Sequence, residues 1–160
     1  MPAKGLFTSD HLPSIAGIDS QAVIGLAISP FEEDLSFFQH MFDDAGWKLL
    51  TARTRWEAVA DLSHGPIAVV ICERHLNDGN WKDVLSRLAS ILNPPRLIVV
   101  SHRSDDELRT EVLNMGGFDL LSAPLQEVEV VHAVGLAVFD WMEEQRQGQV
   151  RWQPRHLALT

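Results

Sequence analysis

The residues with the clearest chemical potential follow an uninterrupted apolar segment. Residues 67–72 are all apolar, and Glu73 comes directly after them. An Asn-Asp-Gly sequence at residues 77–79 then predicts a turn. A carboxylate at the end of a buried strand can bind a cation, form an ion pair or be modified. Glu73 is therefore the first position at which to look for function.

Motifs for other kinds of chemistry are absent from the sequence. There is no Gly-x-Gly-x-x-Gly, Walker loop or Gly-x-Ser-x-Gly. The single cysteine, Cys72, lies within the apolar segment and is interpreted as a core residue. A metal site built from Glu73, His75 and His102 is disfavoured, because these residues lack the spacing of ligands on one helix or hairpin. We expect no metal, no cofactor and no enzymatic activity.

Composition limits the class of protein. The 160 residues carry a formal net charge of −9 and a pI near 5.1, which argues against sequence-independent nucleic-acid binding. No apolar run reaches the roughly 18 to 20 residues that span a bilayer, and the start lacks signal-peptide order. We expect a cytoplasmic protein with no membrane partner. Its predicted parts are a lead-in (1–20), one domain (21–146) and a tail (147–160), which leaves no room for a separate output domain.

Strands and helices are predicted to alternate along the domain. Apolar runs predict five strands at 22–28, 47–51, 67–72, 96–100 and 118–121. Helices are predicted from Ser29-Pro30 to Gly46, then at 54–65, 81–92, 104–116 and 125–146. This alternation predicts an α/β fold, a doubly wound parallel sheet in a three-layer sandwich. The usual strand order at this size is the flavodoxin-like order 2-1-3-4-5.

Several helix starts carry capping signals. Ser29 with Glu32, Thr54 with Glu57, and Ser104 with Glu107 match the capping box. Asn80 or Asp78 is expected to cap the third helix. Acidic residues 32–34 are interpreted as a response to the helix dipole rather than as metal ligands.

The layout of residues 22–146 resembles response-regulator receiver domains of the CheY-like superfamily. Their pattern has two acidic Mg²⁺ ligands after strand one and a phosphoacceptor aspartate at the end of strand three. A hydroxyl follows strand four, and a lysine precedes a proline after strand five. Only the hydroxyl matches here, because the corresponding positions are Ser29 and Pro30, Glu73, Ser101, and Ala123 before Pro124. The resemblance implies a cis Ala123–Pro124 peptide bond.

The charges lost in these replacements argue against Mg²⁺-dependent phosphorylation. Ser29 and Pro30 offer no carboxylate, and Ala123 offers no cation for an incoming phosphoryl group. Glu73 could imitate a phosphorylated aspartate by reaching towards Ser101. The favoured interpretation is a solvated or paired carboxylate, with Arg74 or Arg103 as its partner. Ser101 is expected to satisfy nearby backbone groups.

The resemblance implies a stand-alone degenerate receiver, a phosphorylation-independent interaction module in bacterial two-component-type signalling. Its expected partners are a histidine kinase or a downstream signalling protein. By the resemblance, signalling or homodimer contacts would lie on the face formed by the fourth helix, the fifth strand and the last helix, at Leu108, Leu113, Phe118 and the exposed side of 127–146. Val130, Val134, Val138 and Met142 repeat every four residues and predict either core alone or core plus a dimer seam.

Two other functions stay open from the sequence. One is a working phosphorelay receiver that accepts a phosphoryl group from a histidine kinase on Glu73 or Asp78. The other is a flavodoxin-like domain that binds a small molecule or a flavin, although the acidic, glycine-poor segment after the first strand does not suit a phosphate-binding loop.

Overall fold

Five parallel strands form the central sheet of the protein, seen in a computed structural model that describes residues 23–103 and 106–159, with backbone only for 149–159. The strand order is β2-β1-β3-β6-β7, and every neighbouring pair is parallel. This is the predicted order 2-1-3-4-5 when the five strands are counted along the chain. The strands are β1 (Ile24–Ile28), β2 (Lys48–Ala52), β3 (Val69–Glu73), β6 (Arg96–Ser101) and β7 (Asp119–Ser122).

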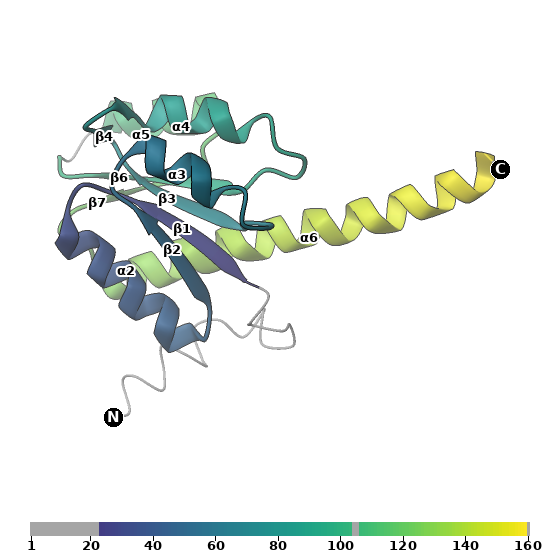
Figure 1. Cartoon of the computed structure of the whole chain (residues 1–160), viewed down its shortest axis with the longest axis horizontal. Helices are drawn as coiled ribbons and strands as arrows, with labels where there is room; N and C mark the ends of the chain where they lie inside the picture. The colour runs from purple at the N-terminus through teal and green to yellow at the C-terminus, as the bar shows by residue number, and fades with distance from the viewer. Residues whose placement is uncertain (1–22, 104–105, 160) are drawn as a thin grey trace.

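Helices cover both faces of the sheet and make the predicted three layers (Figure 1). Helices α2 (Glu32–Ala45) and α6 (Glu127–Leu159) pack on one face. The other face carries three shorter helices, α3 (Arg55–Asp61), α4 (Trp81–Leu88) and α5 (Asp106–Met115). The predicted doubly wound α/β architecture is confirmed.

The strands divide their side chains between two cores because successive residues point to opposite faces. In β3, Val69 and Ile71 join the core under α2 and α6, whereas Val70 and Cys72 join the core under α3, α4 and α5. Full burial raises the pKa of the Cys72 thiol, which fits its predicted role in the core. By the same alternation, Glu73 lies on the side of α2 and α6.

One predicted interaction residue and the apolar stripe of the last helix lie in the core. Leu108 is only 2% exposed and packs in the core, so its assignment to an interaction face was wrong. The stripe of Val130, Val134 and Val138 is buried against the sheet, with Met142 partly buried beside it. The exposed apolar residues of α6 lie on another line of the helix and include Val128, Leu136 and Phe139.

Several predicted helix boundaries needed correction. The last helix does not end near Arg146 but continues to Leu159 and projects beyond the sheet (Figure 1). The sequence after Arg146 contains three glutamines and two arginines, which favour helix, but also Gly148 and Pro154, which do not. Helix α4 ends at Leu88, ahead of the predicted residue 92. A two-stranded hairpin, β4 (His75–Leu76) with β5 (Gly79–Asn80), flanks the predicted Asn-Asp-Gly turn.

The capping predictions had mixed outcomes. Thr54 accepts a hydrogen bond from the Glu57 amide, and Asn80 forms a full capping box with Asp83. Ser29 does not cap α2, because the N-cap residue is Phe31 and the Ser29 hydroxyl accepts the Phe31 N–H instead. The predicted box at Ser104 lies outside the described residues. No helix in the described ranges is long and apolar enough to cross a membrane.

Candidate functional site

The predicted site positions converge on the carboxyl edge of the sheet. In register, Ile28 of β1 pairs with Cys72, and Glu73 pairs with Val100 of β6. The pairing of Ser101 with Ser122 places the start of the next loop, at Ala123, on the same edge. The carboxyl ends of parallel strands are where ligands bind in open α/β sheets. Strand order alone therefore brings these positions together.

Ser29 and Pro30 stand where the receiver pattern has its acidic pair. The Ser29 side chain is buried, and its hydroxyl oxygen accepts the Phe31 N–H at 3.0 Å. Its own backbone N–H donates to the carbonyl of Ala52 at 3.0 Å. Pro30 has no side-chain oxygen. Mg²⁺ requires carboxylate and water oxygens in a near-octahedral arrangement, so the residues at these two positions do not fit it.

Ser101 uses its hydroxyl on the neighbouring loop. Its Oγ donates to the carbonyl of Arg103 at 2.8 Å and accepts the Arg103 N–H at 3.1 Å. The residue is only 1% exposed. Both functions of the hydroxyl are thus used to hold the turn after β6, as the backbone-satisfying interpretation expects.

Glu73 is buried beside a histidine and a second carboxylate. It is 5% exposed, and its Oε1 lies 3.3 Å from Nε2 of His102. That nitrogen also contacts Oδ2 of Asp34 at 3.0 Å. The solvated carboxylate considered from the sequence was wrong, because Glu73 is buried, and the titratable side chain that lies 3.3 Å from its Oε1 is that of His102.

The environment of Glu73 shifts its titration. Burial raises the pKa of the Glu73 carboxyl from 4.5 to about 7, because the charged form loses water. The imidazole of His102 opposes the rise, and the negative charge of Asp34 adds to it. Near neutral pH the side chain therefore exchanges between a neutral acid and a carboxylate.

Asp34 is the site residue that the sequence analysis assigned to the helix dipole alone. It lies in the first turn of α2 but is 8% exposed, on the same buried side as Phe38 and Phe42. Phe38 and Phe42 follow Asp34 at intervals of four residues. The sequence signal for burial of Asp34 was therefore an acidic residue on the same helix face as two apolar residues. His75 is exposed in β4 and does not belong to the group of Asp34, Glu73 and His102.

Two other predicted positions, Pro124 and Asp78, do not belong to the group of Asp34, Glu73 and His102. The Ala123–Pro124 peptide bond, expected to be cis, is cis. Asp78, the other considered phosphoacceptor, accepts the backbone N–H groups of Arg55 and Trp56 at 2.9 and 3.0 Å. These bonds, led by that of Arg55, lower the pKa of Asp78. Asp78 therefore anchors the start of α3.

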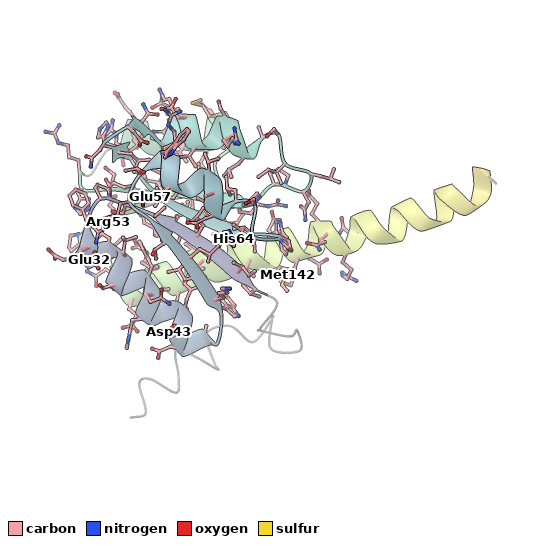
Figure 2. The ribbon with its side chains drawn as sticks, viewed as in Figure 1. Glu32, Asp43, Arg53, Glu57, His64 and Met142 are labelled. Atoms are coloured by element: carbon pink, nitrogen blue, oxygen red, sulfur yellow. The ribbon has the colours of Figure 1, made fainter. Side chains whose placement is uncertain are left out.

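A separate charged group lies beside the same edge, between α2 and α3. Arg53, just after β2, forms an ion pair with Glu32, and its backbone N–H donates to Oε1 of Glu57 at 2.7 Å. Figure 2 shows the three side chains at the end of β2. All are exposed, so the ion pair contributes little to stability.

Comparison with solved structures identifies the fold. A signal receiver domain of an HD domain-containing protein from Pseudomonas fluorescens Pf-5 matches with a TM-score of 0.72 and 21% identity, covering 81% of this chain and 95% of that one. The receiver domain of a putative Luxo repressor protein from Vibrio parahaemolyticus matches with a TM-score of 0.71 and 16% identity, over 77% and 95% of the two chains. A beryllofluoride-activated NtrC4 receiver domain dimer matches with a TM-score of 0.68 and 15% identity, over 74% and 98%. No protein-family model and no curated protein matches the chain. The chain thus has the CheY-like fold of response-regulator receiver domains.

Proposed function

We propose that this protein is a degenerate receiver that acts as a phosphorylation-independent protein-interaction module in two-component-type signalling. The observation that carries the proposal is the state of the acceptor position. Glu73 is buried, and the imidazole of His102 lies against its carboxylate. A phosphodonor would have to displace that imidazole to reach the carboxylate.

The groups around the acceptor position support the same conclusion. Phosphoryl transfer depends on cations that neutralise charge developing on the phosphoryl oxygens. Ala123 supplies none, and Ser29 and Pro30 do not fit Mg²⁺. The second carboxylate, from Asp34, would repel an incoming phosphoryl group.

A surface for partners is available on the last helix. Val128, Leu136 and Phe139 are exposed apolar residues of α6 and fall on one side of the helix by their spacing. We assign this face to a second copy of the chain, in keeping with the similarity to a structure described as a receiver dimer. Histidine kinases and downstream signalling proteins are the other partner classes in this proposal.

The phosphorylation part of the proposal is tested with small phosphodonors. The purified chain is incubated with acetyl phosphate and Mg²⁺, and intact-mass spectrometry measures phosphoryl incorporation. Beryllofluoride with Mg²⁺ is followed in parallel by backbone amide NMR. We expect neither incorporation nor saturable shifts. Incorporation that Glu73→Gln abolishes would establish a working phosphorelay receiver instead, and incorporation lost in Asp78→Asn would assign Asp78.

The dimer is tested by charge substitution on α6. A double variant, Leu136→Glu with Phe139→Glu, should convert the chain to a monomer in sedimentation-velocity experiments over a wide concentration range. Trp56→Glu is the matched control, because Trp56 is an 81% exposed apolar residue on the opposite helical layer. A wild-type chain that is monomeric at every concentration, or a control that dissociates equally, would contradict the assignment.

A further inference from the structure

We propose that Asp34, Glu73 and His102 form a binding site for a divalent first-row transition cation, with Zn²⁺ as the representative ion. Each residue offers one ligand atom, and the three atoms lie within 4.8 Å of one another. The site goes beyond the proposed function and does not depend on it, because a docking surface on α6 can work with or without a cation at the sheet edge.

The distances between the ligand atoms suit direct coordination. Nε2 of His102 lies 3.0 Å from Oδ2 of Asp34 and 3.3 Å from Oε1 of Glu73. Ligands that each sit about 2.0 to 2.2 Å from one Zn²⁺ are separated from one another by about these distances. All three atoms lie within 4.8 Å of one another, so modest movements of the two carboxylates and the imidazole would place them around one ion.

A buried oxygen in the group is without a hydrogen bond. Oε1 of Glu73 has no hydrogen-bond partner among the residues that the structure describes, although Glu73 is 95% buried. Its contact with His102 lacks hydrogen-bond geometry, and Nε2 makes its hydrogen bond to Asp34 instead. Buried polar atoms nearly always have a hydrogen-bond partner, so an unpartnered buried oxygen supports the presence of a ligand at this position. A cation bound there would satisfy it.

The charges of Asp34, Glu73 and His102 also favour a divalent cation. Two nearly buried carboxylates share one imidazole, which can carry only one positive charge. A divalent cation would balance both carboxylates while a neutral imidazole coordinates it. The imidazole is 44% exposed, so the site has an opening to solvent for entry of the ion and for water ligands.

A helix and a strand hold the two carboxylates, and the imidazole comes from the loop after β6. Asp34 is in the first turn of α2, Glu73 ends the central strand β3, and His102 follows β6 directly. The ring of Phe31 meets the His102 imidazole edge-on, with ring centroids 4.7 Å apart. The aromatic ring of Phe31 thus lies against one edge of the imidazole.

The donor set selects against Mg²⁺. Mg²⁺ requires oxygen ligands in near-ideal octahedral geometry, whereas imidazole nitrogen suits Zn²⁺, Fe²⁺, Ni²⁺ and Cu²⁺. The cation proposed here therefore differs in class from the ion that the receiver pattern implies, and it uses Asp34 and His102, which lie outside that pattern.

The test is calorimetric titration of the chelator-treated, full-length chain with Zn²⁺. We expect one saturable site per chain, which millimolar Mg²⁺ does not block. Asp34→Asn, Glu73→Gln and His102→Gln should each weaken Zn²⁺ binding by at least about tenfold, since even the loss of an outer-shell partner costs 10- to 100-fold. Glu33→Gln and His75→Gln are the matched controls, because both residues are exposed, and neither should change the affinity.

A second measurement does not depend on variant folding. Co²⁺ added to the wild-type chain should shift NMR signals most strongly around His102, Glu73 and the first turn of α2. The proposal is overturned if no stoichiometric Zn²⁺ binding occurs, if the three variants bind as the wild type does, or if Co²⁺ shifts centre on another histidine. Any of these results would leave the phosphorylation and dimer tests unaffected, because those tests have separate readouts.

Discussion

Replacing Glu73 by glutamine should change the way in which the stability of the fold depends on pH. Burial raises the pKa of Glu73 to about 7 in the folded chain, against an ordinary value of 4.5. Between these two values the folded state binds the proton more tightly than the unfolded state does. The contribution of Glu73 to stability is therefore fully present below pH 4.5 and is lost as the pH rises to about 7.

The size of this effect follows from the shift. A change from 4.5 to about 7 corresponds to about 3 kcal/mol if it is taken in full. The opening of the site beside His102 and the interaction with that imidazole reduce the effect. We expect the wild-type free energy of unfolding to fall by about 1 to 2 kcal/mol more than that of Glu73→Gln between pH 5 and pH 8.

The assay is urea unfolding of both proteins at several pH values, with a chelator present so that bound metal does not contribute. The other titrating groups are shared by the two proteins, and their effects largely cancel in the difference. Glutamine keeps the size of the side chain and leaves the Asp34–His102 hydrogen bond in place, which makes it a conservative substitution.

Two outcomes would refute the reasoning. A stability difference that is constant from pH 5 to pH 8 would mean that Glu73 titrates in the folded chain as it does in the unfolded chain. A difference of opposite sign would mean that an ion pair with His102 outweighs the burial of the carboxylate. Glu73 would then be charged over this whole pH range, and the His102 imidazole would cover a charged carboxylate at the acceptor position.

Two further substitutions test the packing and the capping by urea unfolding. Gly25→Ala should destabilise the fold by about 1 to 3 kcal/mol, because a Cβ there would lie 2.5 Å from the Phe42 ring. The control is Gly148→Ala, which should cause no loss of stability, because nothing lies within 4 Å of its Cβ. Asn80→Ala should cost about 1 kcal/mol, because the Asn80 side chain accepts the Lys82 N–H at 2.8 Å. An exposed control in the same helix, Ser86→Ala, should stay within about 0.5 kcal/mol, and equal effects in the two variants would contradict the capping role.

Much of the fold was accessible from local sequence patterns. Apolar strands and amphipathic helices have fixed periods, so their order along the chain predicted the parallel sheet and its layers. The positions of Glu73 and Ser101 at strand ends followed directly from that order. Helix ends were less well predicted, because Ser29 carries a capping signal that the chain uses for a turn instead.

The site itself was decided by tertiary structure. Asp34 and His102 are 68 residues apart and become partners only when α2 packs beside the end of β6. The sequence shows an acidic first helical turn and a histidine after a strand, each of which is ordinary by itself. Helical and strand periods are local, whereas contacts between elements depend on how the layers pack and on which rotamers that packing allows. The sequence alone therefore determined the elements and the edge where they end, and only the packed chain placed two carboxylates and an imidazole in contact there.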